Sequence, residues 1–257
     1  MKKANPVLLL TMLLMAIVVS CKKNTGYTAS GSLNYVNAVV NAELLTADFG
    51  IDKRLIFYDV TQAFRYASPT SYNFQSLPPG PNKLDIYGYG DTTEHDSPLA
   101  SVVLDIVPAD MYTLFLSGNR AQIDTVLIKE QFPAYAVNDS SFSVRFLNLS
   151  RGTNPVSAEI DEVPQTGATS IVYKAKSNWI PLSAQSKVSN YQIRFKDQVT
   201  GNILATATLE NINLPGDATL PNPWRRNNYS IALIGDPAAT TGEYVLKVLL
   251  VRHFFPG

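Results

Sequence analysis

Residues Leu33-Asn34-Tyr35-Val36-Asn37-Ala38 recur further along the chain as Val144-Arg145-Phe146-Leu147-Asn148-Leu149, with the second asparagine in register. In the later copy the apolar side chains of Val144 and Phe146 alternate with Arg145. This period of two is typical of a β-strand, and it places Arg145 on the face opposite to the apolar pair. A strand motif that appears twice predicts an internal repeat.

Four more blocks match in the same order. Residues 73–77 match 178–182, 84–87 match 191–194, 112–118 match 229–235, and 126–133 match 249–256. We therefore expect two tandem domains, residues 32–136 and residues 142–257, joined by a polar linker at residues 138–141.

The remaining pattern predicts the fold class. Short runs of Val, Ile, Leu, Phe and Tyr alternate with clusters of Pro, Gly, Asn, Asp and Ser, and no segment shows a helical period. We predict an all-β protein. A domain of this length with about seven short strands fits an immunoglobulin-like β-sandwich, in shape only, because the cysteine and tryptophan signature of antibody domains is absent.

The first 20 residues have the pattern of a secretory signal peptide. Lys2 and Lys3 precede an apolar run over residues 7–19, which is shorter than the roughly 20 residues that span a bilayer. Val18-Val19-Ser20-Cys21 resembles the lipobox of bacterial lipoproteins, although an ordinary signal peptide with a coincidental cysteine would look similar. We expect lipidation at Cys21 and a flexible tether over residues 21–31. The mature protein would then lie in the cell envelope, at the outer membrane, on a side that the sequence leaves open.

Motifs of the second repeat resemble a known family. Together, residues 143–150, 155–161, 178–182 and 229–235 look like the DUF4397 family. The resemblance covers residues 142–257 well and residues 32–136 more loosely. It implies β-sandwich domains of unknown function, often in tandem, in secreted and lipid-anchored bacterial proteins, and the lipoprotein architecture is similar to envelope proteins of Bacteroidetes. It implies no catalytic residues.

Composition and motifs narrow the function classes. Lysine plus arginine equals aspartate plus glutamate at 21 each, so a nucleic-acid partner is not expected. Two separated histidines and one cysteine predict no transition-metal site, and we expect no cofactor. Residues 91–96 form an acidic stretch that a solvated loop explains most simply, and His253 fits a hydrogen-bonded structural residue. No common nucleophile, nucleotide or metalloprotease motif appears, and we expect no enzymatic activity.

The two tryptophans suggest different roles. Trp179 matches Phe74 in the first repeat, and we expect an aromatic residue kept in both copies to lie in the core. Trp224 lies in a Pro-rich loop and precedes Arg225 and Arg226, residue types that are enriched at interaction hot spots. We select Trp224, Arg225 and Arg226 as candidate ligand-binding residues. The alternative is that Trp224 closes one end of the sandwich while the arginines are solvated.

Three functions agree with these observations. The leading hypothesis is a lipid-anchored, non-enzymatic envelope protein that binds a protein partner or a glycan. The second is a fimbrillin-like structural or adhesin component of a surface filament, which a strand missing from either sandwich would favour. The third is a glycan-processing enzyme, which needs an acid-lined cleft, and the contact between the repeats is the expected place for one.

Overall fold

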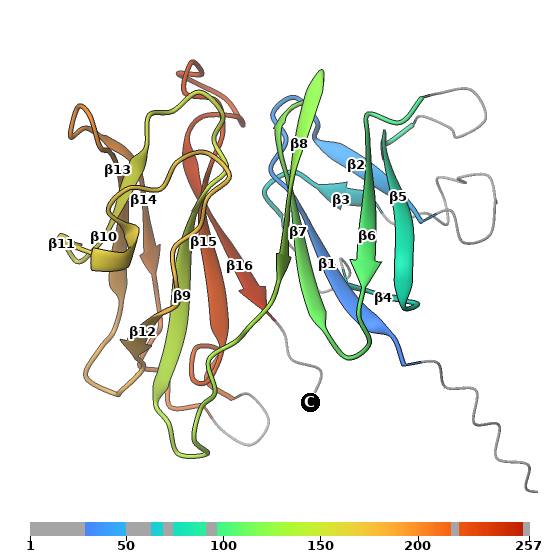
Figure 1. Ribbon diagram of the computed structural model, residues 1–257. Helices are drawn as coiled ribbons and strands as arrows, with labels where there is room; N and C mark the ends of the chain where they lie inside the picture. The colour runs from blue at the N-terminus through green and yellow to red at the C-terminus, as the bar shows by residue number, and fades with distance from the viewer. Residues whose placement is uncertain (1–28, 50–62, 69–73, 91–96, 217–220, 254–257) are drawn as a thin grey trace, which may run out of the picture.

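The computed structural model describes residues 29–49, 63–68, 74–90, 97–216 and 221–253, which form two β-sandwiches side by side (Figure 1). Strands make up 52% of the structure and helix 2%, so the prediction of an all-β protein with tandem sandwich domains is confirmed. The strands of the first sandwich are β1 (Gly31–Asn37), β2 (Leu44–Asp48), β3 (Ala63–Arg65), β4 (Phe74–Leu77), β5 (Gly80–Gly88), β6 (Ala100–Ile106), β7 (Met111–Asn119) and β8 (Gln122–Lys129). The strands of the second are β9 (Ser141–Asn148), β10 (Val156–Ile160), β11 (Val163–Pro164), β12 (Ile180–Ser183), β13 (Tyr191–Asp197), β14 (Ile203–Leu209), β15 (Asn228–Ile234) and β16 (Lys247–His253), with a short 3-10 turn, η2 (Thr166–Ala168), after β11.

The two sandwiches have the same topology. The first consists of sheets with strand orders β4-β1-β7-β8 and β3-β2-β5-β6, and the second of sheets ordered β12-β9-β15-β16 and β11-β10-β13-β14. In each, the first strand of the repeat lies parallel to the seventh: β1 pairs with β7, and β9 pairs with β15. Each strand of the first repeat therefore has a counterpart eight strands later, in agreement with the repeat that the sequence shows.

The strand registers agree with most of the sequence alignment. Leu33 pairs with Tyr112 in the first repeat, and Val144 pairs with Tyr229 in the second, as the matched blocks predict. Likewise Phe115 pairs with Val126, and its counterpart Ala232 pairs with Leu249. The faces of these sheets can therefore be compared residue by residue.

One matched block is out of register. The inward-facing pair of β5 is Leu84 and Ile86, and the inward-facing pair of β13 is Ile193 and Phe195, all four fully buried. The sequence alignment matched Leu84 with Tyr191, which is two residues too early. A shift of two residues keeps the same face of a strand, and this is why the alternation did not reveal the error.

A buried asparagine ends the first strand of each repeat. Asn37 Oδ1 accepts a hydrogen bond from the Val39 N–H at 2.9 Å, and its Nδ2 donates to the Ala42 carbonyl at 2.8 Å. Asn148 does the same with the Ser150 N–H at 3.1 Å and the Ile171 carbonyl at 3.3 Å. In both repeats the amide satisfies backbone groups where the chain leaves one sheet for the other. This role explains why an asparagine stands at the same position in both repeats.

The four sheets stack as four layers with three apolar cores between them (Figure 1). Two of these cores fill the two sandwiches, one around Tyr35 and Phe64 and the other around Phe146 and Phe195. The third lies between the sandwiches, where the sheet containing β1 packs on the sheet containing β9. Its buried members are Val36, Ala38, Tyr66, Phe115, Ile128, Leu147, Leu149, Ala232, Ile234, Leu249 and Val251. An apolar core of this kind holds the two sandwiches in one relative orientation.

The connections divide between two ends of the molecule. In Figure 1, β1 runs upward from Gly31, and β8 and β16 both run downward. The β1–β2, β7–β8, β9–β10 and β15–β16 connections therefore meet at the upper end. Gly31, the segment of residues 130–140 that joins the sandwiches, and the connection before β15 lie at the lower end.

Candidate functional site

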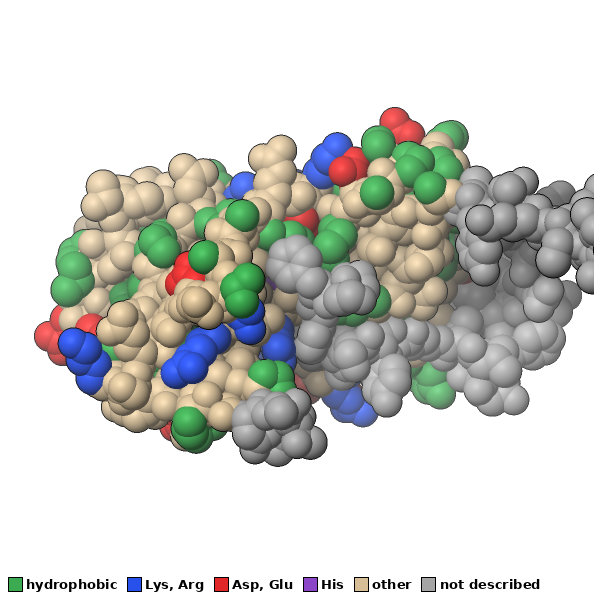
Figure 2. Space-filling view, turned by 90° about the horizontal axis from the view of Figure 1, so that it is seen from below, with side chains coloured by type: hydrophobic (Ala, Val, Ile, Leu, Met, Phe, Trp, Pro, Cys, Tyr) green, Lys and Arg blue, Asp and Glu red, His purple; other side chains and the backbone are tan. Residues whose placement is uncertain are grey.

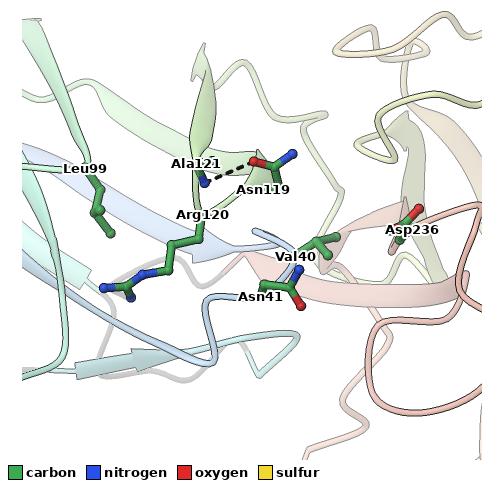
Figure 3. Close-up of a pocket in the computed structure, with 7 residues that line it drawn as sticks. All are labelled: Val40, Asn41, Leu99, Asn119, Arg120, Ala121 and Asp236. Carbon is green, nitrogen blue, oxygen red and sulfur yellow. Dashed lines mark hydrogen bonds between the residues drawn. The ribbon is translucent and has the colours of Figure 1, made fainter.

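An open pocket of about 580 Å³ lies at the upper end, on the seam between the sandwiches. It is formed by the β1–β2 and β7–β8 connections and the start of β6 in the first sandwich, together with the β15–β16 connection of the second (Figure 3). Its lining residues are Val40, Asn41, Leu99, Asn119, Arg120, Ala121 and Asp236. Since both sandwiches contribute, the shape of this pocket depends on the third core below it.

The surface of the pocket is mostly apolar, and its lining residues include polar side chains of three kinds. Val40 and Leu99 supply apolar surface, Asn41 and Asn119 supply amides, Arg120 a guanidinium and Asp236 a carboxylate. A mostly apolar lining in which a few polar groups set the ligand's orientation is usual for a small-molecule site.

Local hydrogen bonds fix two of these side chains. Asn119 Oδ1 accepts from the N–H groups of Ala121 and Gln122, both at 3.0 Å, so the turn between β7 and β8 orients the amide. Asp236 Oδ1 accepts from the Ala238 N–H at 2.9 Å. Asn119 and Asp236 occupy equivalent places, because each directly follows the glycine that the two repeats share, Gly118 or Gly235.

A glycine with positive φ stands one residue before each of these side chains. Gly118 has φ +84° and Gly235 has φ +106°, values that L side chains rarely adopt. A Cβ at Gly118 would fall on the carbonyl oxygen of Gln122, and one at Gly235 on that of Val245. The glycines therefore permit the close hairpins that carry Asn119 and Asp236 to the seam.

Polar contacts continue the seam below the pocket. Asp124 Oδ2 accepts a hydrogen bond from the Tyr173 hydroxyl at 3.0 Å, and the same hydroxyl lies 3.0 Å from Ser117 Oγ. Lys174 Nζ lies 3.3 Å from the other oxygen of Asp124, and Arg151 lies 3.8 Å from the carboxylate. Burial raises the pKa of Tyr173 to about 12, so the phenol stays protonated and can donate at all ordinary pH values.

A buried ionic network closes the lower end of the seam. Arg145 donates from both terminal nitrogens to Glu130 at 2.7 Å and from Nε to Ser230 at 2.8 Å. Side-chain exposure is 2% for Arg145 and 1% for Glu130. His253 Nε2 lies 2.7 Å from Ser230 Oγ, and burial, followed by the charge of Arg145, holds the pKa of His253 well below its usual value. These groups are sealed from solvent and neutralise one another, so they stabilise the seam and offer nothing to a substrate.

Trp179 belongs to this network, contrary to its predicted place in a sandwich core. The Arg145 guanidinium lies 4.5 Å from the Trp179 ring centroid, and the indole N–H donates to the Gln131 carbonyl at 3.0 Å. The ring is only half-buried. It covers the network from outside because the face of β9 that carries Arg145 packs on the first sandwich.

Trp224 is instead the tryptophan of the second core. Its exposed fraction is 7%, its ring packs on Phe142 and Tyr229, and its N–H donates to the Glu210 carbonyl at 3.0 Å. The ring therefore closes the lower end of the sandwich, and its faces are not open for ligand stacking.

The two arginines after Trp224 lie at the same lower end. Arg225 Nε donates to the Ala184 carbonyl at 3.2 Å, and Arg226 donates to the Val137 carbonyl at 3.1 Å. Figure 2 looks onto this end and shows Lys and Arg side chains over the second sandwich. The loop of Trp224, Arg225 and Arg226 is thus at the opposite end of the molecule from the pocket.

Several predictions about the site concern other parts of the chain. Cys21 and the acidic stretch at residues 91–96 lie outside the described residues. Within the described ranges, no group of three or more His, Cys, Asp or Glu side chains could hold a metal ion. No helix in the same ranges combines the length and apolarity needed to cross a membrane.

Sequence reasoning missed the pocket residues, although one signal was available. Asn119 and Asp236 each follow the matched glycine of their repeat, and polar residues at equivalent hairpin tips could have drawn attention to that end. The remaining lining residues come from connections whose meeting depends on the way the two sandwiches pack.

Comparisons with solved structures give only distant matches. A candidate adhesin from Bacteroides ovatus is 12% identical, with 89% of this chain and 96% of that chain covered and a TM-score of 0.25. A candidate polysaccharide-binding protein (DUF1812) from Bacteroides thetaiotaomicron is 12% identical, with 88% and 98% covered and a TM-score of 0.22. The fimbrial anchor protein Mfa2 from Porphyromonas gingivalis is 7% identical, with 86% and 96% covered and a TM-score of 0.24. TM-scores of this size establish neither a shared fold nor a shared function.

Sequence comparison is more informative. No curated protein matches the chain. The family described as "Domain of unknown function (DUF4397)" matches residues 31–159, which comprise the first sandwich, the linking segment, all of β9 and most of β10. The sequence motifs had suggested the closer resemblance in residues 142–257, whereas the match lies mainly on the first repeat. With half of its length matched, the chain belongs to the DUF4397 family.

Proposed function

We propose that this protein is a lipid-anchored, non-enzymatic binding protein of the cell envelope, and that the pocket on the seam takes a saccharide unit of a glycan. The observation that carries the proposal is the position of the pocket. It is built by both sandwiches at the end opposite to Gly31, where the chain enters the first sandwich. A lipid at Cys21 and a tether over residues 21–31 would therefore present the pocket away from the membrane.

The lining favours a polyhydroxylated ligand. Vicinal hydroxyl groups both donate and accept hydrogen bonds. The amide of Asn41 can do both in return, and the NH2 group of Asn119 can donate while its oxygen is held by the turn. The guanidinium of Arg120 only donates, and the carboxylate of Asp236 only accepts, so together they can orient a sugar ring. Val40 and Leu99 offer apolar surface to the C–H face of such a ring.

The structure gives less support to the other two hypotheses. The described residues supply eight strands with equivalent pairings in each sandwich, so neither repeat lacks a strand that the other has, as donor-strand assembly would favour. A glycosidase needs two carboxyl groups about 5 to 10 Å apart at the substrate. Among the described residues that line the pocket, Asp236 is the single carboxylate.

Glycan binding by the soluble chain that begins at Lys22 tests the pocket. Glycans that bind on an array are titrated by calorimetry against the wild type, Asp236→Ala and Arg120→Ala. Loss of one charged hydrogen-bonding group is expected to weaken binding by about tenfold or more. Arg226→Ala is the matched control, because it removes an exposed arginine at the other end, and it should bind like the wild type. If Arg226→Ala loses binding and the pocket variants keep it, the ligand binds at the Trp224 loop and the proposal is wrong.

The anchor has its own test. Cells are grown with a labelled fatty acid, and the label should appear in the wild-type chain and not in Cys21→Ser. Protease treatment of intact cells then shows on which side of the outer membrane the sandwiches lie. A wild-type chain that carries no label would contradict the lipid anchor without affecting the pocket.

A further inference from the structure

The core between the sandwiches is built from the same positions of both repeats. Val36 on β1, Phe115 on β7 and Val126 on β8 are paired neighbours and form a row across the sheet. The equivalent row of the second repeat is Leu147 on β9, Ala232 on β15 and Leu249 on β16. Both rows lie in the shared core. The equivalent residues are Val36 with Leu147, Ala38 with Leu149, Phe115 with Ala232, Val126 with Leu249, and Ile128 with Val251.

Polar contacts of the seam follow the same rule. Tyr66 and Tyr173 are equivalent, because the next residue of each donates its N–H to the carbonyl of the asparagine that ends the first strand of its repeat. Each tyrosine contacts the closing hairpin of the other repeat. Lys247 Nζ lies 4.6 Å from the Tyr66 ring centroid, and the Tyr173 hydroxyl donates to Asp124 at 3.0 Å. Asp124 and Lys247 are themselves equivalent, because Asp124 pairs with Ser117 and Lys247 pairs with Ile234.

A face that contacts its own equivalent forms an isologous interface, the arrangement of twofold homodimers. Figure 1 agrees with this, since β8 and β16 run in the same direction on either side of the seam. Each repeat therefore has a face that fits a second copy of the same fold. In the folded chain that second copy is the neighbouring repeat.

We propose that this face also pairs between molecules, so that the first repeat of one chain binds the second repeat of another and two chains form a domain-exchanged dimer. The partner is a second copy of this chain. The proposal is independent of the glycan pocket, because an exchanged seam has the same contacts as the seam within one chain.

The buried ion pair determines which repeats pair. Arg145 stands where the first repeat has Asn34, since Arg145 pairs with Ser230 as Asn34 pairs with Thr113. Glu130 and His253 are also equivalent, because each follows the residue that pairs with the matched tyrosine, Tyr112 or Tyr229. Two first repeats would bury Glu130 without a cation, and two second repeats would bury Arg145 without a carboxylate. Only unlike repeats satisfy the pair, and an exchanged dimer contains two such contacts.

The connecting segment is suited to exchange. Residues 130–140 lie outside the strands, and Val137 within this segment is 83% exposed. Eleven residues can extend over about 36–40 Å once the hydrogen bonds at Gln131, Tyr135 and Val137 have opened. The seam within one chain has to open before its second sandwich can bind another chain. At low protein concentration the monomer is favoured, because the attached repeat has a high effective concentration.

A charge-exchange experiment tests the proposal with two soluble chains that begin at Lys22, contain both sandwiches and carry different tags. One has Glu130→Arg and the other Arg145→Glu, so that each alone places two like charges in the buried seam. When the two are unfolded together and refolded as a mixture, exchange restores an Arg–Glu pair at both seams. We expect a heterodimer of twice the chain mass by light scattering, and co-purification of the second chain on the first chain's tag. The double variant with both changes in one chain is the control, and it should refold as a monomer.

The outcomes separate clearly. A heterodimer in the refolded mixture supports intermolecular pairing. If the single variants aggregate, the two chains are co-expressed instead, and a heterodimer from co-expression supports the proposal equally. A mixture without heterodimer beside a monomeric, folded control overturns it, because the seam then forms only within one chain. If the control does not fold, wild-type chains with two tags are refolded at high concentration. Co-purification of both tags then supports the proposal, and its absence overturns it.

Discussion

Replacing Arg145 by methionine should destabilise the protein by about 3–5 kcal/mol, the usual cost of removing one partner from a buried ion pair. The size of the effect follows from the surroundings. Arg145 makes two hydrogen bonds to Glu130 and one to Ser230, and the Glu130 side chain is only 1% exposed. Without the guanidinium, the carboxylate keeps its desolvation cost and loses its cation. The contact of Arg145 with the Trp179 ring, at 4.5 Å, adds about 1 kcal/mol.

Urea unfolding followed by tryptophan fluorescence measures this cost. Trp179 reports on the seam and Trp224 on the second core, so single-tryptophan variants show whether the seam opens first. In the double variant Arg145→Met with Glu130→Gln, the loss should be smaller than the sum of the two single losses by about 2–3 kcal/mol. The exposed pair Arg194–Glu162 is the control, and breaking it should cost less than about 1 kcal/mol. A loss below about 1 kcal/mol for Arg145→Met, or strict additivity in the cycle, would refute the reasoning.

Three further outcomes are expected. His253 has a pKa depressed by burial, so the unfolded chain binds a proton on this residue more readily than the folded chain. The contribution of His253 to stability should be full above about pH 6.5 and fall by up to about 1.4 kcal/mol per pH unit below it. His253→Gln should remove this part of the pH dependence in urea titrations. Trp224→Ala should cost about 3–5 kcal/mol by thermal or urea unfolding and clearly more than Trp179→Ala, and the reverse order would contradict the placement of the two rings. Gly235→Ala should destabilise more than Gly242→Ala in the same assay, because both have positive φ but only Gly235 has a carbonyl oxygen where the Cβ would stand.

The sequence predicted the β architecture and the repeat because both rest on local, periodic signals. Alternation identifies the faces of a strand, and it placed Arg145 correctly on the face of β9 opposite to Phe146. It could not show that this second face is also buried, since that depends on the first sandwich lying against it. Trp179 was assigned to a sandwich core and lies on the seam for the same reason, because its ring covers contacts between the two sandwiches. Trp224 was selected for ligand binding with closure of the sandwich end as the alternative, and its burial agrees with that alternative.

The pocket illustrates a second limit. Its lining comes from connections that are far apart in sequence and share no motif, such as Asn41, Leu99 and Asp236. Their proximity follows from the pairing of β1 with β7 and from the packing of one sandwich on the other. Local patterns contain no information on that packing, whereas matched positions in the two repeats contain some, as Asn119 and Asp236 show.

The position of β1 has a mechanical consequence. β1 is the first strand of the first sandwich, lies between β4 and β7, and begins at the end of the molecule opposite to the pocket. If the chain is held before Gly31 while a bound ligand is pulled at the pocket, the force acts along the strands. The hydrogen bonds that join β1 to its two neighbours are then loaded together in shear, and none is peeled away singly. A protein held in this way should resist stretching much better than one pulled across its sheets.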